Sequence, residues 1–229
     1  MSESDDWVFP ASARVGDRNG DGTGVDGAGD DGVIVGADFS DLVFAGQRWS
    51  RRRFVSCLFV EADLRELTTE QCEFTECDFS RADLGDSVHI GSALRACEFT
   101  RVTLSGIRLR GCSLLGSRFT DCRVRPMTIT DSDLSLASLG GLDLRDTELG
   151  GLRMRETNLV SADLRGASLR GCDLSGARLS RARLDRADLR DVVIEAGSLL
   201  GATVTDARVS LELAIDFARA HGLRVDAAN

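Results

Sequence analysis

Large apolar residues recur at every fifth position of this chain, from Phe39 to Val209, without an insertion or a deletion. The spacing holds for 35 consecutive units, and only Thr69 and His89 interrupt the apolar series. Two residues before each large residue lies a second inward position, most often Ala, Ser or Cys, and the remaining positions are mainly polar. A five-residue period matches neither the 3.6-residue helix nor the two-residue strand, so each unit needs its own bend.

Four short extended segments, each followed by a bend, close a four-sided coil of 20 residues on which the next coil can stack. The pattern therefore predicts an all-β solenoid over residues 36–209, in which each coil packs mainly on its neighbours. At the usual β spacing of about 4.8 Å per coil, the repeat gives about 8.75 coils and a rod roughly 40 Å long. Pro126 falls at a bend, where we expect its missing N–H to be tolerated.

The segments before and after the repeat have different character. Residues 1–35 are rich in Gly and Asp and carry no period, so we predict a disordered acidic tail. Part of this tail copies the first half of a calcium-binding loop, with Asp17, Asn19, Asp21 and Gly22. Ala28 stands where the bidentate acid of such a loop belongs, which favours a plain acidic tail over a calcium site.

The C-terminal segment, residues 210–229, is predicted to begin with a helix over 211–221. Ser210 can cap the start of this helix, and Gly222 can end it. Its apolar side chains must cover the open end of the last coil, and whether they also form a dimer contact is left open by the residues themselves. The candidates for the cap and the dimer contact are Leu211, Leu213, Ile215, Phe217, Ala218 and His221.

A long ungapped series of A(D/N)Lxx units resembles the pentapeptide-repeat family, whose fold is a right-handed quadrilateral β-helix. Three stretches resemble its mycobacterial fluoroquinolone-resistance members: ECDFSRADLGDSVHIGSALRACEF (76–99), CRVRPMTITDSDLSLASLGGLDLR (122–145) and AIDFARAHGLRV (214–225). The related Qnr proteins carry projecting loops, which an ungapped register leaves no room for. The resemblance implies a DNA-mimicking protein that binds DNA gyrase and forms a homodimer through its C-terminal helix.

Charge is distributed in bands along the repeat. The net charge of −9 argues against direct nucleic-acid binding, and the tail alone supplies −6 of it. Residues 101–130 are basic, with six arginines against Asp121, whereas residues 61–86 hold nine acids against Arg65 and Arg81. These acids are our candidates for a partner-binding surface, although solvated outward positions explain them equally well: Glu61, Asp63, Glu66, Glu70, Glu73, Glu76, Asp78, Asp83 and Asp86. Duplex DNA carries about one charge per 1.7 Å, which is denser than this chain as a whole and argues against mimicry by the entire rod.

The seven cysteines all occupy the small inward slot, so we interpret them as space-filling residues rather than as metal ligands or a redox pair. They are Cys57, Cys72, Cys77, Cys97, Cys112, Cys122 and Cys172. His89 also falls at an inward position, with Thr69 directly beneath it one coil earlier. The sequence has neither a Gly-rich phosphate loop nor a distinct pair of carboxylates, and we predict no catalytic residue, no metal and no cofactor.

Three functions are therefore compared. The first is a cytoplasmic, non-enzymatic protein that occupies the DNA-binding surface of gyrase and inhibits the enzyme, protects it from a fluoroquinolone-type poison, or both. The second is a structural interaction module with a different partner, and the third is a redox or metal protein. The N-terminus lacks the layout of a secretion signal, and no apolar run approaches the roughly 18 residues of a membrane helix.

Overall fold

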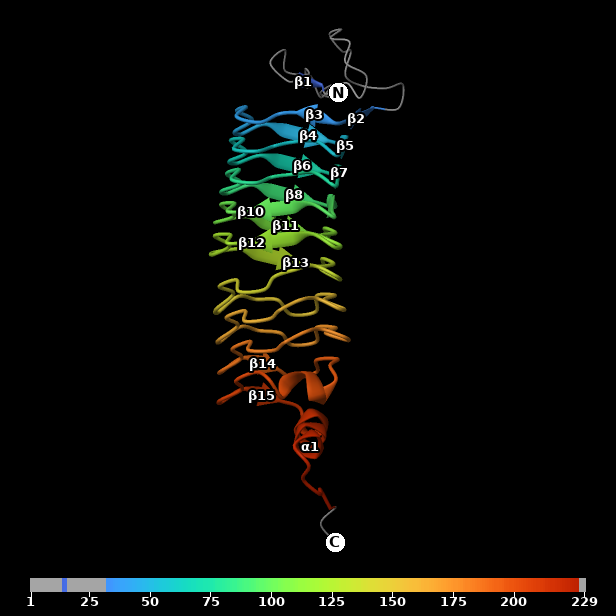
Figure 1. Ribbon diagram of the computed structural model, residues 1–229, viewed down its shortest axis with the longest axis vertical. Helices are drawn as coiled ribbons and strands as arrows, with labels where there is room; N and C mark the ends of the chain where they lie inside the picture. Colours follow the sequence, from blue (N-terminus) through green and yellow to red (C-terminus); the bar gives the residue numbers. More distant parts are fainter. Residues whose placement is uncertain (1–13, 16–31, 227–229) are drawn as a thin grey trace, which may run out of the picture.

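The structure, a computed structural model, describes residues 14–15 and 32–226, which form a parallel β-solenoid closed at one end by a helix (Figure 1). Residues pair with the residue twenty positions later, as Val33 does with Arg53 and Asp188 with Arg208. This register confirms the predicted 20-residue coil and gives roughly nine turns from Val33 to Val209. The ladder begins at Val33, three residues before the predicted start of the repeat. Most of the predicted acidic tail, including the calcium-like stretch, lies outside the described residues.

We number the four faces by the inward residues of the first complete turn. Face 1 follows Phe39, face 2 Phe44, face 3 Trp49 and face 4 Phe54, and each face continues at every twentieth residue. Face 3 carries a five-stranded parallel sheet, in the order β13-β11-β8-β6-β4, and face 4 carries the sheet β2-β5-β7-β9. Face 2 is built from isolated bridges between turns rather than from named strands, and so is most of the C-terminal half of the rod.

The strands are two or three residues long, as expected from five-residue units. On faces 1 and 2 and at the N-terminal edge they are β1 (Arg14–Val15), β3 (Ala37–Asp38), β10 (Glu98–Thr100) and β12 (Arg118–Thr120). Face 3 has β4 (Arg48–Ser50), β6 (Thr68–Glu70), β8 (Val88–Ile90), β11 (Arg108–Arg110), β13 (Thr128–Thr130), β14 (Asp188–Leu189) and β15 (Arg208–Val209). Face 4 has β2 (Val33–Val35), β5 (Arg53–Val55), β7 (Glu73–Thr75) and β9 (Ala93–Arg95). The backbone of β1 pairs antiparallel with β3 at the first turn.

At most bends the second residue after the inward one lies in the left-handed region, with φ of 58° at Glu61 and 57° at Glu66; among the described residues Pro126, Ala196 and Gly201 are exceptions. At many of these bends a turn bond joins the inward carbonyl to the N–H three residues later, as between the Phe59 carbonyl and the Ala62 N–H at 3.2 Å. This combination is that of a type II turn, and it explains how a chain with a five-residue period can form a closed coil. Gly106 fills one such position because a Cβ there would collide with the Asp86 side chain of the coil below.

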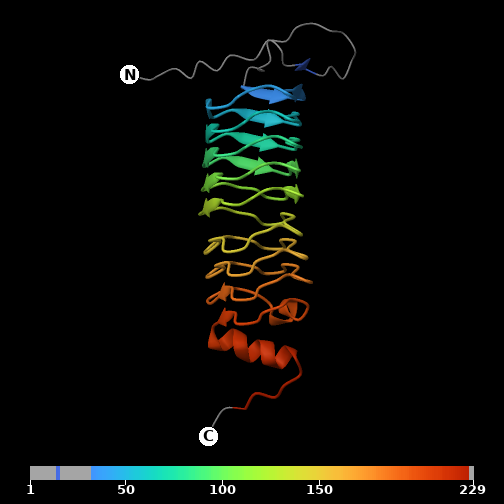
Figure 2. The same ribbon diagram turned by 90° about the vertical axis from the view of Figure 1, so that its left-hand side faces the viewer.

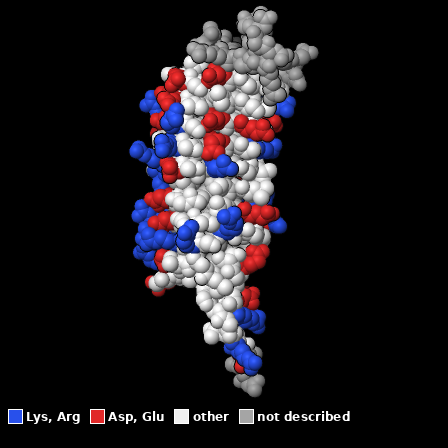
Figure 3. All heavy atoms as spheres, viewed as in Figure 1, with Lys and Arg blue, Asp and Glu red and all other residues white. Residues whose placement is uncertain are grey.

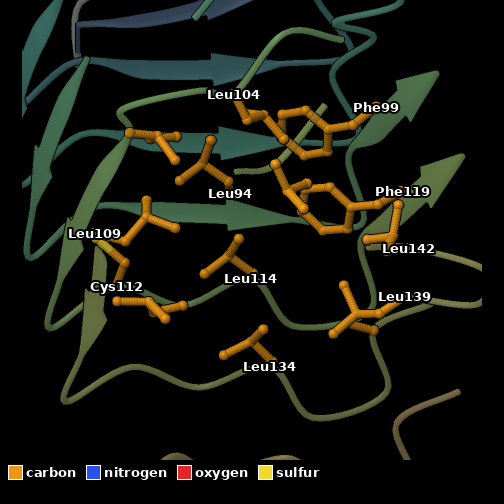
Figure 4. Packing of buried hydrophobic residues seen from close by; sticks show 14 of the residues in the cluster. Leu94, Phe99, Leu104, Leu109, Cys112, Leu114, Phe119, Leu134, Leu139 and Leu142 are labelled. Carbon is orange, nitrogen blue, oxygen red and sulfur yellow. The ribbon is translucent and has the colours of Figure 1, made fainter. Parts of the chain in front are cut away.

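The core is a set of stacked columns, one for each face. On face 1, Phe39, Phe59, Phe79, Phe99 and Phe119 form parallel ring stacks with centroid separations of 4.6–5.0 Å. These separations match the roughly 4.8 Å between turns, so backbone pairing and ring stacking reinforce each other. Leu139 follows Phe119 in this column, and the rings end there (Figure 4). An internal cavity of about 40 Å³ lies where the aromatic column gives way to leucines, lined by Phe119, Val124 and Leu142 among others.

The main-chain hydrogen bonds between successive coils are interrupted at one place. There, residues 121–131 lie one coil before residues 140–150 and lack most of the bonds to them. In regular turns the bend N–H bonds to the next coil, as Glu66 does to Gly85 at 2.9 Å and Asp146 to Arg165 at 3.0 Å. Among the described residues, the N–H groups of Asp121, Val124 and Asp131 have no such main-chain bond, and Pro126 has none to donate. Pro126 therefore differs from the expectation for a proline at a bend, because regular bends use the N–H donor that proline lacks.

Faces 1 and 4 keep their pairing across this junction, through Arg118–Ser138 and Asp133–Arg153 bridges, whereas faces 2 and 3 lose it. The peptide bond between Arg125 and Pro126 is cis. A surface cleft of about 280 Å³ opens at the interruption, lined by residues 125–130 and 145–148. The rod is therefore continuous on two faces and open on the other two at this point.

The C-terminal end is closed by η1 (Ala196–Leu199) and by α1 (Leu211–Ala220), which lies across the last turn (Figure 2). Ser210 caps α1 by accepting the Leu213 N–H at 3.4 Å, as predicted. The helix ends in a Schellman motif, in which Gly222 N–H bonds to Arg219 and Leu223 N–H bonds to Ala218. Among the described residues, no helix has the length and apolar character needed to cross a lipid bilayer.

Candidate functional site

The structure gathers six of the nine predicted acids on faces 1 and 2. Asp78 belongs to the ladder of backbone bridges on face 1 that runs Asp38–Leu58–Asp78–Glu98. Asp63 and Asp83 are joined by a backbone bridge on face 2. Glu61, Glu66 and Asp86 occupy the exposed bends that border these ladders. In Figure 3 red side chains run down the front of the upper half of the rod.

The other three predicted acids point elsewhere. Glu70 belongs to β6 on face 3, and Glu73 to β7 on face 4, with Glu76 at the bend after it. Asp38, Asp41 and Glu98 instead share faces 1 and 2 with the six, although they lie outside the 61–86 stretch. Grouping the acids by twenty-residue period, rather than by closeness in sequence, would have found them. We call the following nine residues the acidic patch: Asp38, Asp41, Glu61, Asp63, Glu66, Asp78, Asp83, Asp86 and Glu98.

Some of these carboxylates also serve the backbone. The Oδ1 atoms of Asp38, Asp78 and Asp83 each accept the N–H two residues later, at 2.8–2.9 Å. This N–H belongs to the residue after the inward one, and outside the strands it has no main-chain acceptor among the described residues. The acidic residue of the repeat is therefore a local cap, which uses one oxygen and leaves the carboxylate charge on the surface.

Ion pairs neutralise only part of the acidic patch. Glu61 pairs with Arg81 at 2.6 Å, and Glu98 with Arg118 at 3.4 Å. Asp63 accepts two hydrogen bonds from the Arg65 guanidinium, which lowers the pKa of the Asp63 carboxyl. Asp41, Glu66, Asp78, Asp83 and Asp86 form no ion pair within 4.0 Å among the described residues. The patch thus keeps a strong negative field at neutral pH.

The carboxylates of the acidic patch, counted without the arginines beside them, are spaced almost as densely as the phosphates of DNA. Four turns at about 4.8 Å each span about 19 Å, so nine carboxylates give about one charge per 2 Å, compared with about one per 1.7 Å in duplex DNA. Three arginines, Arg65, Arg81 and Arg101, lie on the same two faces and reduce the net charge to −6. The comparison with DNA therefore applies to one part of the rod and not to its whole length.

The apolar residues of α1 are divided between two sides. Leu213 is buried, and with Ala214 and Phe217 it lines a cavity of about 190 Å³ against Leu199 and Val204 of the last turns. Leu211 is 74% exposed, and Ile215 and Ala218 are half-buried. The exposed His221 ring packs on Phe217, with centroids 4.5 Å apart. One side of the helix covers the core and leaves an incompletely filled apolar end.

His89 is fully enclosed and forms no pair with a cysteine. Its Nδ1 lies 2.7 Å from Thr69 Oγ1, and its Nε2 lies 3.1 Å from Ser87 Oγ. Because the Ser87 hydroxyl donates to the Leu84 carbonyl at 2.8 Å, its oxygen accepts from Nε2–H, and Nδ1 then accepts from Thr69. Burial lowers the His89 pKa to about 4, so this ring is neutral at physiological pH.

The cysteine thiols donate to backbone carbonyls, as Cys57 does to Ile34 and Cys97 to Phe74. Six of the seven are buried, and Cys122, at the interrupted junction, is half-buried. Among the described residues no group of His, Cys, Asp and Glu side chains could hold a metal ion.

The four-sided coil, the capping aspartates and the left-handed bends together define a pentapeptide-repeat solenoid. The family model for pentapeptide repeats matches residues 57–87, 91–125, 132–171, 157–195 and 172–208, and the chain belongs to this family.

Among curated relatives, the chain is similar to two proteins named pentapeptide repeat protein MfpA. The one from Mycolicibacterium smegmatis is 45% identical over 61 residues, which cover 27% of this chain and 29% of the relative. The one from Mycobacterium tuberculosis is 49% identical over 49 residues, covering 21% of this chain and 27% of the relative. The aligned segments therefore span less than a third of either relative.

Solved structures extend the similarity in fold over most of the chain. A trypsin-treated form of QnrB1, described as a plasmid-mediated fluoroquinolone resistance protein, superposes with a TM-score of 0.72 at 23% identity. The superposition covers 85% of this chain and 97% of that one. HetL from Nostoc, a pentapeptide repeat protein involved in heterocyst differentiation regulation, gives a TM-score of 0.52 at 20% identity over 77% of this chain and 86% of HetL. At these identities the structures establish the fold.

Proposed function

We propose that this protein is a non-enzymatic, cytoplasmic DNA mimic that binds DNA gyrase and thereby inhibits it, protects it from fluoroquinolone-type poisons, or both. The observation that carries the proposal is the acidic patch, whose nine carboxylates lie on two adjacent faces and leave a net charge of −6 after the three neighbouring arginines are counted. The resistance-related name of QnrB1 and the similarity to MfpA support the same assignment. Binding would occur through electrostatic complementarity with a basic DNA-binding groove, which favours fast, salt-sensitive association.

The test compares two sets of charge changes of equal size. Asp78→Asn, Asp83→Asn and Asp86→Asn together remove three charges from the acidic patch, and the asparagine oxygens can still accept the backbone N–H groups. Glu70→Gln, Glu73→Gln and Glu148→Gln remove three charges from faces 3 and 4, away from the bend between faces 4 and 1 that Glu76 occupies. We expect the Asn variant to need at least about tenfold more protein to inhibit supercoiling by purified gyrase, a loss of about 1.4 kcal/mol. The Gln variant should match the native protein.

An equal loss of gyrase inhibition in both variants would show that inhibition depends on the net charge of the protein and not on the position of the acidic patch. If the native protein leaves gyrase supercoiling and drug-induced cleavage unchanged at micromolar concentration and low salt, the proposal is wrong. A pull-down that recovers a different partner would then favour the interaction-module hypothesis.

The same proposal includes a homodimer through α1. Leu211 is 74% exposed beside the unfilled apolar end of the solenoid, and Val209 and Leu223 are exposed near it. A second copy that places the same end against this one would cover these residues in both chains, as a two-fold interface requires. Leu211→Asp should convert the dimer to a monomer in sedimentation velocity, whereas Leu136→Asp, at an exposed leucine in the middle of the rod, should leave it dimeric.

A further inference from the structure

A second charged surface lies on the same two faces, near the C-terminal end. Four exposed arginines occupy one turn, and we call them the arginine coil: Arg178, Arg181, Arg183 and Arg186. Arg178 extends the face 1 ladder from Asn158, and Arg183 extends the face 2 ladder from Asp163. Arg181 and Arg186 occupy the bends that follow faces 1 and 2, with φ of 61° and 62°. In Figure 3 blue side chains crowd the lower left edge of the rod.

Most other arginines of the C-terminal half form ion pairs, whereas three of the four in the arginine coil form none among the described residues. Arg145, Arg165 and Arg190 each form short bidentate contacts with an aspartate two residues earlier. In the arginine coil only Arg183 has a carboxylate nearby, at 3.6 Å from Asp163, and the other three have none within 4.0 Å among the described residues. These guanidinium groups are available to an external anion.

Faces 1 and 2 are therefore opposite in charge at their two ends. The acidic patch and its three neighbouring arginines give −6 toward the N-terminus. From Arg118 to Asp206 the same faces carry nine arginines and six acids, a net of +3: Arg118, Arg123, Arg125, Arg145, Arg165, Arg178, Arg181, Arg183 and Arg186 against Asp121, Asp143, Asp146, Asp163, Asp185 and Asp206. A basic groove that accepts the acidic patch would repel this end, so the two ends need different partners.

We propose that the arginine coil binds the phosphate backbone of duplex DNA, so that the protein bridges a basic groove on its partner enzyme and the DNA that lies beside it. The identity of the enzyme rests on the proposed function above, but the DNA contact does not. Arginine is suited to this role because its planar fork can donate two hydrogen bonds to one phosphate. The net charge of −9, which led us to expect no nucleic-acid binding, is an average over the acidic tail, the acidic patch and this basic turn, and it does not exclude a local contact.

The experiment measures binding of the full chain to a fluorescent 20-base-pair duplex by anisotropy, without gyrase and over a range of salt concentrations. Arg178→Gln, Arg181→Gln, Arg183→Gln and Arg186→Gln are combined in one variant. The matched control carries Arg48→Gln, Arg51→Gln, Arg95→Gln and Arg110→Gln, four exposed arginines of faces 3 and 4. Losing four phosphate contacts should reduce the slope of log affinity against log salt by about 3–4, while the control keeps the native slope.

Thermal unfolding by circular dichroism checks that both variants remain folded, and a gyrase supercoiling assay is run on each. If the native protein does not bind the duplex, or if the arginine-coil variant binds it as the native protein does, the inference is overturned. Loss of gyrase inhibition in that variant, without DNA binding by the native protein, would assign the arginine coil to an acidic protein surface instead. The acidic-patch Asn variant separates the two proposals, because it should lose gyrase inhibition and keep DNA binding.

Discussion

In the N-terminal half of the rod, five phenylalanines stack along face 1 and hydrogen-bonded strands cover faces 3 and 4, whereas in the C-terminal half leucines fill the same columns and single bridges replace most strands. The outward residues of faces 1 and 2 change in the same direction, from a net negative to a net positive surface. The boundary is the interrupted junction between residues 121–131 and 140–150. The comparison teaches that one backbone pattern with one continuous core can hold two halves that differ in core packing and have opposite net charge on faces 1 and 2.

The largest expected effect comes from the columns themselves. Phe79→Ala should lower the free energy of unfolding by about 3–5 kcal/mol and Leu159→Ala by about 2–5 kcal/mol, because both side chains are almost fully buried. Trp49 lies in the N-terminal half, so in a Trp7→Phe background its fluorescence reports that half alone. Phe79→Ala should shift the fluorescence transition more than the circular-dichroism transition, because the junction weakens the coupling between halves. Coincident transitions in both variants would show that the halves unfold as one unit.

The next effect depends on pH and belongs to the N-terminal half. In the unfolded chain His89 takes up a proton near pH 6.5, whereas burial lowers its pKa to about 4 in the folded protein. The unfolded state binds more protons between these values, so stability falls as the pH drops from about 6.5 to about 4, by about 3 kcal/mol in total.

Urea denaturation at several pH values measures this dependence. His89→Gln should remove most of it, and His221→Gln, at the exposed second histidine, should leave it intact. A native pH profile that His89→Gln does not change would contradict the assignment.

Removing a capping aspartate should lower the free energy of unfolding by different amounts in the two halves, and this difference should be smaller than the effects above. Asp163 accepts the Arg165 N–H, binds the Arg165 guanidinium and lies 3.6 Å from Arg183. In the part of the chain that the structure describes, Asp83 accepts only the Gly85 N–H. Asp163→Ala should therefore destabilise by about 2 kcal/mol and Asp83→Ala by about 1 kcal/mol, measured by urea denaturation. Asp83→Asn, which keeps the acceptor, should have almost no effect, and equal losses at the two alanine variants would rule out the added role of the arginines.

The last prediction concerns the boundary itself. Cys122 is the half-buried cysteine and lies where the ladder is open, whereas the others are enclosed by paired turns. Under native conditions Cys122 should react with a thiol reagent at least about tenfold faster than any other cysteine, which corresponds to about 1.4 kcal/mol of easier local opening. Peptide mapping by mass spectrometry identifies the labelled site, and Cys122→Ser should abolish the fast phase. Comparable labelling of Cys57 or Cys97 would show that the junction is no more open than a regular turn.

Much of the fold follows from the sequence because the period is strict. Phe39, Leu64 and Leu189 could be placed in the core from their spacing alone, and the turns and the register follow the same rule, whereas the terminal helix follows from its capping residues Ser210 and Gly222. The site is only partly predictable, because closeness in sequence is not closeness in space: Glu73 lies on face 4 and Asp78 on face 1, while Asp38 shares face 1 with Asp78. The interrupted junction does not follow from the bend at Pro126 alone, because it depends on an acceptor in the next turn that proline leaves without a donor.

The twenty-residue register also sets how this molecule could change in length. Removing a complete coil would shorten the rod by about 4.8 Å and keep every later side chain on its own face. Removing a single five-residue unit would still leave a large residue at every inward position, but it would turn everything after it by one face. A unit lost between Glu98 and Arg178 would thus leave a folded rod whose acidic patch and arginine coil no longer share two faces. The number of units between two surfaces therefore acts as an angular setting, and evolution or design could reorient the two partners without altering a single contact residue.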